Sequence, residues 1–246
     1  MAVLDVGTGP YALFAIMAAN LGAGKVYAIE ANSQAAASAR DFVKKAGYTD
    51  EEITILEGFS TKLQLPQPVD FCIAEIVGSI ASEEGAYATI RDAAARFMKN
   101  PERADSWIPR VIQTYGAPAS YTLHTLLGPP EFDWSKLGGE PVRFNCRDPG
   151  LQLLADPVLV EEIDFSQINS PAQEKKNGKN TLSFTVDAGR IEENGVALYN
   201  EFRRGRSSVV DSERLAADAA HSVSGFAMWP RLVMEDDLIV DARAYG

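Results

Sequence analysis

Short apolar runs alternate with helical segments through the first 98 residues, and this alternation limits the possible fold more than any other feature. The runs that we predict to be strands are 2–6, 25–30, 53–56 and 71–76. The segments that we predict to be helices are 11–22, 33–45 and 82–98. This pattern is typical of a parallel sheet covered by helices on both faces. Right-handed crossovers then bring all the carboxyl ends of the strands to one edge, where ligands bind.

The first turn at that edge is rich in glycine. Asp5, Gly7 and Gly9 lie between a predicted strand and a predicted helix, in the sequence DVGTG. Glycines at this place allow the backbone to approach a ligand, and the N–H groups of the following helix face it. The third glycine of a dinucleotide fingerprint is absent, since Pro10 and Tyr11 follow. The turn therefore indicates either a nucleotide-like ligand or an ordinary structural turn.

Polar side chains follow the next two predicted strands. Glu30 ends the second strand about 20 residues after the glycines, where a carboxylate suits the two hydroxyls of a ribose. Ser60 and Thr61 follow the third strand, and we expect them near the adenine end of the same ligand. The alternatives are a solvated glutamate and an ordinary polar loop.

Two carboxylates bracket the segment EIVGSIASEE after the fourth predicted strand. Glu75 ends that strand, and Glu84 lies in the first turn of the next predicted helix. Gly78 and Ser79 allow the chain between them to fold back, so that both acids could flank one planar, bidentate cation such as guanidinium. An acid in the first turn of a helix is also favoured by the helix dipole alone. A carboxylate that closes an apolar strand is costly without a partner, so Glu75 is the stronger candidate.

The composition and the periodicity of the sequence change after about residue 112. Prolines and glycines cluster, and helical periodicity fades. The strand-like runs that follow are 157–163, 181–186, 209–210 and 227–233, with an exposed loop expected at 173–180 and a turn at Asn177-Gly178. We therefore predict an α/β domain over 1–112 and a mostly antiparallel, β-barrel-like domain over 113–246.

Composition excludes several classes of function. Apolar residues make up 46% of the 246-residue chain and charged residues 23%, as in ordinary globular proteins. The net charge of −11 argues against non-specific nucleic-acid binding and favours basic partners, although it also serves solubility alone. No apolar run approaches the roughly 20 residues of a membrane helix. His124 and His221 lack metal-ligand spacing, so we expect no metal site.

The two cysteines, with Cys72 inside an apolar strand, indicate a reducing, intracellular compartment. We expect a cytoplasmic location and do not exclude the nucleus. The first predicted strand begins at the first residues, so we expect no signal peptide.

The sequence VLDVGTGPYALFAIMAANLGAGKVYAIEA resembles the opening of class I S-adenosylmethionine-dependent methyltransferases. The run ITILEGFSTKLQLPQPVDFCIAEIVGS is similar to the matching stretch of protein arginine methyltransferases, whose double-glutamate loop typically reads S-E-W-M-G-x(5)-E. Glu75, Gly78 and Glu84 match the acids and the glycine of that loop. The segment GFAMWPRLVM is similar to a G-F-x-x-W-F segment of the family's C-terminal barrel. The resemblance is specific over residues 3–98 and loose beyond them.

This resemblance implies a Rossmann-like class I methyltransferase sheet followed by the barrel-like domain, with S-adenosylmethionine as cofactor. It implies that Glu75 and Glu84 hold the guanidinium of an arginine in a basic protein or peptide. It also implies a possible homodimer, with residues 120–148 as the arm. The residues that it places around the cofactor are Asp5, Gly7, Gly9, Glu30, Ser60 and Thr61.

The chain departs from the family pattern at several places. Tyr11 stands where the family usually has glycine, and AEIVGS replaces SEWMGY around Glu75. No T-H-W segment is present, and we expect the helix that precedes the first strand in the family to be missing from this chain.

Three other functions fit part of the pattern. One is a methyltransferase that acts on a small amine or another nucleophile. Another is a non-catalytic methyltransferase-like domain that binds partners. The third is a nicotinamide-dependent oxidoreductase, which the incomplete glycine fingerprint and the lack of a Tyr-x-x-x-Lys pair disfavour.

Overall fold

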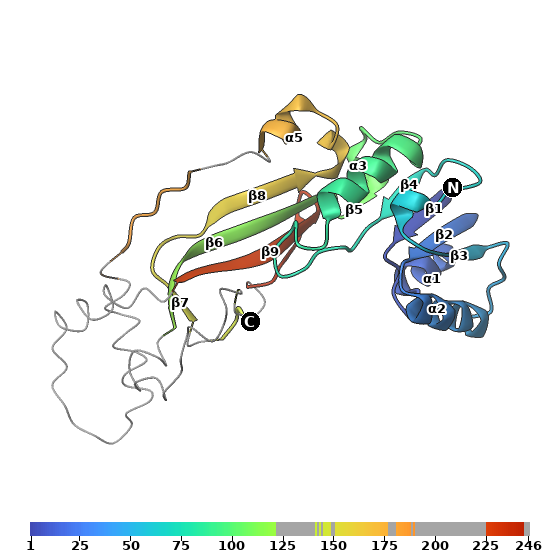
Figure 1. The fold of residues 1–246 in the computed structure, drawn as a ribbon, viewed down its shortest axis with the longest axis horizontal. Helices are drawn as coiled ribbons and strands as arrows, with labels where there is room; N and C mark the ends of the chain where they lie inside the picture. The colour runs from blue at the N-terminus through green and yellow to red at the C-terminus, as the bar shows by residue number, and fades with distance from the viewer. Residues whose placement is uncertain are drawn as a thin grey trace, which may run out of the picture. The chain divides into compact units, whose positions relative to one another are not determined.

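The structure, a computed structural model, describes residues 1–121, 141, 143, 145–148, 151–176, 181–187, 189 and 225–243. Contacts between residues divide the chain into two compact units. Figure 1 labels most of the helices and strands of the described residues. The first unit comprises Met1–Gln113, Glu161–Lys179 and Pro230–Val240. The second comprises Thr114–Val160, Asn180–Trp229 and Asp241–Gly246.

A five-stranded parallel sheet forms the centre of the first unit, as the sequence predicts. Its strand order is β3-β2-β1-β4-β5. The bounds of these strands are β1 Ala2–Val6, β2 Lys25–Glu30, β3 Ile53–Glu57, β4 Phe71–Ile73 and β5 Trp107–Ile108. All five residues of β1 are buried, as expected for the central strand of a sheet covered on both faces.

Strand β4 is shorter than the predicted 71–76. Ala74 donates its N–H to the carbonyl of Ile108 at 2.8 Å, and Pro109 then follows with no N–H to continue the ladder. Pairing therefore stops at this point. Glu75 does not end the strand, because the strand ends at Ile73.

Three helices connect the strands. Their bounds are α1 Leu13–Asn20, α2 Ser33–Lys45 and α3 Ala86–Arg96. Asn32 caps the start of α2, because its side chain accepts the N–H of Ala35 at 3.0 Å.

Helix α3 begins later than predicted. Gly85 is its N-cap in the left-handed region, at φ +74°, which glycine adopts without steric cost. Its N–H donates to the carbonyl of Ser82 at 3.1 Å, so the segment before the helix is a turn. The prediction that Glu84 lies in the first turn of the helix is therefore wrong. One face of α3 and the residue that follows it are buried, with Ala86, Ile90, Ala94 and Phe97 at helical spacing.

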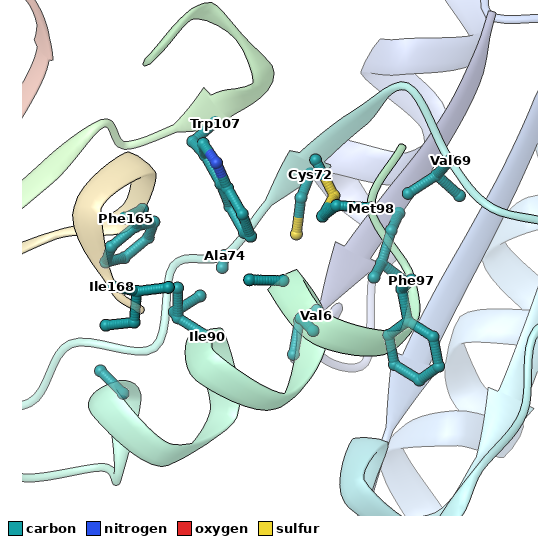
Figure 2. Close-up of a cluster of buried hydrophobic side chains, with 14 of the residues drawn as sticks. Val6, Val69, Cys72, Ala74, Ile90, Phe97, Met98, Trp107, Phe165 and Ile168 are labelled. Atoms are coloured by element: carbon teal, nitrogen blue, oxygen red, sulfur yellow. The ribbon is translucent and has the colours of Figure 1, made fainter. Parts of the chain in front are cut away.

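Successive residues of β1 point to opposite faces of the sheet, and each face carries its own core. Val3 belongs to the cluster that includes α1 and α2, with Ala15, Ala39 and Val43. Leu4 belongs to the cluster on the face of α3. Figure 2 shows this second cluster; its labelled members are Val6, Val69, Cys72, Ala74, Ile90, Phe97, Met98, Trp107, Phe165 and Ile168.

Residues from late in the sequence complete that second core. The ring of Phe165 meets Trp107 edge to face, with 5.7 Å between ring centroids. Phe165 and Ile168 are both buried, and they belong to the segment that follows strand β8, Val158–Asp164. The core of the first unit is therefore closed by residues about 60 positions beyond β5 in the chain.

The second sheet is an antiparallel half-barrel, which confirms the predicted fold class. Its order is β10-β9-β6-β7, and β8 also pairs with β6. Its other strands are β6 Val111–Tyr121, β7 Leu151–Leu153, β9 Gly225–Glu235 and β10 Leu238–Asp241. Trp229 is buried in a small core with Ala119, Leu151 and Ala227.

Some predictions for the second half are wrong, and others lie outside the described residues. Residues 181–186 form no strand, and Pro171–Lys176 forms a short helix, α5, in place of an exposed loop. Gln173 of this helix is buried and donates to the carbonyl of Glu162 at 2.7 Å. The predictions that lie outside the described residues concern His124, His221, the turn at 177–178, the strand at 209–210 and most of 120–148. Among the helices that the structure describes, none has the length and apolar character needed to cross a membrane.

Candidate functional site

The ends of β1, β2 and β3 are joined by backbone hydrogen bonds at one edge of the parallel sheet. The N–H groups of Gly7 and Thr8 both donate to the carbonyl of Ile29, at 2.9 and 3.0 Å. The N–H of Gly58 donates to the carbonyl of Glu30 at 2.8 Å. The predicted glycine turn and the predicted acidic strand end therefore lie side by side.

Gly7 also touches the loop that follows β4. Its φ of +78° lies in the region that favours glycine, and a methyl group added there would lie 3.1 Å from Cγ2 of Ile76. Ile76 directly follows Glu75. The close approach at Gly7 thus brings the loop that carries the candidate catalytic acid against the glycine turn.

Asp5 is buried beneath this turn. Its carboxylate accepts the hydroxyl of Thr8 at 2.5 Å. Burial raises the pKa of Asp5 to about 6, the nearby charge of Glu30 adds to the increase, and the hydrogen bond from Thr8 opposes it. Asp5 is therefore a buried group that shapes the turn from below.

Glu30 binds the backbone of the glycine turn. One carboxylate oxygen accepts the N–H of Gly9 at 2.9 Å, and the other accepts the N–H of Asn32 at 2.8 Å. Nothing lies within 4 Å of the position that a side chain at Gly9 would take. A carboxylate with two oxygens thus stands beside open space over a glycine-rich backbone, which is the arrangement that a ribose requires.

Tyr11, the residue that replaces the usual glycine, packs against helix α2. Its ring packs edge to face on Phe42 of α2, with 4.9 Å between centroids, and the residue is 62% exposed. The next residue, Ala12, adopts a left-handed conformation at φ +47° and is the N-cap of α1. A non-glycine residue rarely adopts this conformation, so the turn is strained at Ala12.

Ser60 and Thr61 begin a short 3₁₀ turn, Ser60–Lys62, after β3. Ser60 is buried, whereas Thr61 is exposed. Arg96 of α3 holds this turn, because its guanidinium donates to the carbonyls of Ser60 and Leu63, each at 2.7 Å. Asp92, one helical turn earlier, accepts from the same guanidinium. Arg96 therefore fixes the loop where the sequence predicts adenine contacts.

Glu75 and Glu84 lie close enough for their charges to interact. Partial burial raises the pKa of Glu75 above its usual range, and the charge of Glu84 raises it further. Glu75 is nevertheless exposed, contrary to the expectation of a buried strand end, and Glu84 is exposed as well. Two exposed acids with repelling charges favour a cation between them. No group of three or more His, Cys, Asp or Glu side chains in the described ranges is arranged to hold a metal ion.

Sequence reasoning missed several residues that position the site. The spacing of Asp92 and Arg96, four residues apart on a helix, was the one available signal for their pairing. Glu83 accepts the N–H of Ser79, and Glu161 accepts the N–H of Ser82 at 2.9 Å. Nothing in the sequence indicates the second contact, because its partners are 79 residues apart.

Comparisons with known proteins agree with the resemblance that the sequence indicates. The profile of the family described as Ribosomal protein L11 methyltransferase (PrmA) matches residues 1–87. Protein arginine N-methyltransferase PRMT10 of Arabidopsis thaliana is 37% identical over 111 residues, which are 43% of this chain and 28% of that protein. The chain spans less than half the length of the curated relatives it matches.

Two solved structures share the fold. Protein arginine methyltransferase 10 of Arabidopsis thaliana, described in a uniquely open conformation, has a TM-score of 0.58 at 22% identity, over 98% of this chain and 68% of that one. The Trypanosoma brucei PRMT1 enzyme–prozyme heterotetrameric complex with AdoHcy has a TM-score of 0.50 at 23% identity, over 67% of this chain and 53% of that one. The comparisons confirm the resemblance to protein arginine methyltransferases, and the structural matches establish the shared fold.

Proposed function

We propose that this chain carries the catalytic part of an S-adenosylmethionine-dependent methyltransferase that modifies arginine in proteins. One observation carries the proposal. The loop with Glu75 lies against the glycine turn through Ile76 and Gly7, and the charge of Glu84 acts on Glu75. A candidate cofactor site and a candidate cation site are thereby neighbours.

The residues at the sheet edge fit the cofactor. Gly9 leaves the backbone accessible, and Gly7 allows the loop of Ile76 to approach. Each carboxylate oxygen of Glu30 already accepts one backbone N–H and has a second lone pair for a ribose hydroxyl. Ser60 and Thr61 would lie on the adenine side, on the turn that Arg96 holds. Asp5 would line the turn from beneath, where its carboxylate already binds Thr8.

Glu75 and Glu84 would hold the substrate guanidinium. A guanidinium is planar and presents paired N–H donors, which two carboxylates can engage from both sides. Holding the cation in this way also relieves the repulsion that raises the pKa of Glu75. An ammonium lacks the planar fork and fits such a pair less well.

Bound S-adenosylmethionine supplies an electrophilic methyl group on a sulfonium sulfur. The guanidinium is a weak nucleophile because its lone pairs are delocalised, so the enzyme must aim one nitrogen and favour its lone pair. Glu75 and Glu84 draw positive charge toward the nitrogens that they bind and leave the remaining nitrogen more nucleophilic. They would also stabilise the positive charge that the guanidinium gains with the methyl group when the methyl–sulfur bond breaks and leaves the neutral thioether S-adenosylhomocysteine, and the surplus proton would leave to a carboxylate or to water.

The proposed partner is a basic, arginine-containing protein or peptide, which suits a chain with a net charge of −11. We also propose the domain roles of cofactor binding for 1–112 and of substrate binding and dimerisation for 113–246. We further propose an intracellular, cytoplasmic location.

We propose a homodimer as the assembly. Leu13, Met17 and Leu21 follow one another at helical spacing on and just after α1, and they are 57, 48 and 86% exposed. Three exposed apolar side chains on one helix favour burial by a second protein surface, which in the proposed homodimer belongs to the 113–246 domain of the other copy. Sedimentation of the wild type and of Met17→Glu tests this assembly: the substitution should shift a dimer to monomer, and a monomeric wild type would contradict it.

Calorimetry with S-adenosylhomocysteine, followed by a radiolabelled methyl-transfer assay on an arginine-rich peptide, tests the proposed function. We expect binding and transfer, with no label on the same peptide in which lysine replaces arginine. Binding without transfer to any protein or peptide would support the non-catalytic alternative. Transfer to a small amine alone would support a different methyl acceptor, and binding of NAD without S-adenosylhomocysteine would support the oxidoreductase.

A further inference from the structure

Glu83, the neighbour of Glu84, turns back onto the start of its own loop. Its carboxylate accepts the backbone N–H of Ser79. Its side chain also lies directly over Gly78, where an added methyl group would overlap the carboxylate and come within 2.9 Å of Cβ of Glu83. Glycine is therefore required at 78 because Glu83 occupies the space above it.

A second carboxylate holds the same loop from another element. Glu161 of β8 accepts the backbone N–H of Ser82 at 2.9 Å. Both Ser82 and Glu161 belong to the first unit of the structure. The loop is thus bound at two backbone N–H groups that lie between Glu75 and Glu84.

These contacts matter because residues 74–85 have no helix or strand to fix them. Hydrogen bonds to a charged acceptor are stronger than neutral ones. The bond from Glu83 closes the segment from Ser79 to Glu83, and Glu84 follows at once. The position of one proposed guanidinium-binding acid therefore depends on a carboxylate that need not touch the substrate.

We propose that Glu83 and Glu161 are positioning residues that hold Glu75 and Glu84 in register with each other. The inference rests on the proposed function, since it assigns Glu75 and Glu84 to the substrate cation. The two kinds of acid differ in what they require. Glu75 and Glu84 must carry negative charge, whereas Glu83 and Glu161 need only an oxygen that accepts an N–H.

Amide and alkyl replacements separate these roles. We expect Glu83→Gln and Glu161→Gln to keep kcat within about threefold of wild type, because a glutamine oxygen still accepts the N–H. We expect Glu83→Ala and Glu161→Leu to lower kcat about tenfold to thirtyfold, with the affinity for S-adenosylhomocysteine unchanged. Glu174→Gln, an exposed acid on α5, is the matched control and should leave both quantities unchanged.

A double-mutant cycle tests the contact between Glu83 and Gly78. Gly78→Ala should displace the Glu83 side chain and lower kcat by about as much as Glu83→Ala. The combined Gly78→Ala/Glu83→Gly variant should be no slower than Glu83→Gly alone, because neither the carboxylate nor Cβ of residue 83 then occupies the space. Additive losses would show that glycine at 78 serves another purpose and would overturn this part of the proposal.

Hydrogen exchange gives a readout that does not depend on activity. In Glu83→Ala the amide of Ser79 should exchange faster, and in Glu161→Leu the amide of Ser82 should do so, while the amide of Ala36 in α2 keeps its protection. Unchanged exchange at Ser79 and Ser82 would overturn the positioning role even in an active enzyme. If these variants show faster exchange but the wild-type protein methylates no arginine peptide, the loop contacts are supported and the proposed function is contradicted. A loss in Glu83→Gln as large as in Glu83→Ala would overturn the claim that an acceptor oxygen suffices.

Discussion

The glycine turn and the loop from Glu75 to Gly85 lie at the same edge of the sheet but are held in different ways. The turn is bound directly to strand β2 by backbone groups, because Gly7 and Thr8 donate to the carbonyl of Ile29, and the carboxylates of Asp5 and Glu30 add to these bonds. The loop is fixed by carboxylate side chains that bind its backbone N–H groups. The position of the proposed cofactor side is therefore set largely by the strands beneath it, whereas the position of the proposed substrate side is set by single side chains.

The largest expected effect is on the substrate side. Glu75→Gln should lower the rate of methyl transfer to an arginine peptide by about 10²–10³-fold, because a charged contact to the guanidinium is lost in the transition state. The affinity for S-adenosylhomocysteine, measured by calorimetry, should persist because the glycine turn is untouched. A variant with an unchanged rate would remove Glu75 from the mechanism, and Glu174→Gln serves as the control for general loss of charge.

On the cofactor side, Asp5→Asn should change how stability depends on pH. The pKa of Asp5 is raised to about 6 in the folded protein, so folding favours the protonated acid. Its contribution to stability is therefore greatest below pH 4 and declines as the pH rises through 6, by about 3 kcal/mol in total.

The free energy of unfolding from urea titrations, measured between pH 3.5 and 7.5 for wild type and Asp5→Asn, should show this trend in the difference. Asp41→Asn, at an exposed position on α2, is the control. A difference that is flat with pH would show that Asp5 has an ordinary pKa.

An intermediate effect is expected where a side chain, rather than the backbone, supports the cofactor side. Arg96→Met removes the donors to the carbonyls of Ser60 and Leu63 and should weaken S-adenosylhomocysteine binding by about tenfold. Arg103→Met, which breaks the exposed pair with Asp105, should leave binding unchanged. Equal binding in Arg96→Met and wild type would place the turn after β3 outside the cofactor site.

The smallest expected effect is a shift in the pH dependence of catalysis. Partial burial raises the pKa of Glu75 and the charge of Glu84 raises it further, and Glu75 must be ionised to bind the guanidinium. In Glu84→Gln the acid limb of the kcat/KM profile should therefore move to lower pH, although the maximum rate falls. A limb that stays in place would mean that the two carboxylates are too far apart to share one cation.

The parallel sheet could be predicted from the sequence because its strands are local apolar runs bounded by glycine and by helix caps. Asn32 is an example, since its side chain and the helix that it caps are neighbours in the chain. The end of β4 could not be predicted, because it depends on Pro109, the residue after β5. The residue pattern of a single strand does not indicate where a strand that is distant in the sequence will stop pairing with it.

Part of the candidate site could also be predicted from the sequence, but the start of α3 could not. Asp5, Gly7, Gly9 and Glu30 follow from the order of turns and strand ends, and the structure brings them together. The start of α3 was misjudged because Glu83 and Glu84 look like acids of a first helical turn. The carboxylate of Glu83 instead accepts the backbone N–H of Ser79. This contact competes with helix formation, and the periodicity of the sequence does not indicate it.

The account rests on one claim, that Glu75 and Glu84 bind a single guanidinium beside the cofactor. A crystal structure of the protein with S-adenosylhomocysteine and an arginine peptide tests it most directly. We predict that both carboxylates lie within hydrogen-bonding distance of the same guanidinium, with the free nitrogen facing the sulfur. An arginine bound elsewhere, or a guanidinium that contacts neither acid, would contradict the claim.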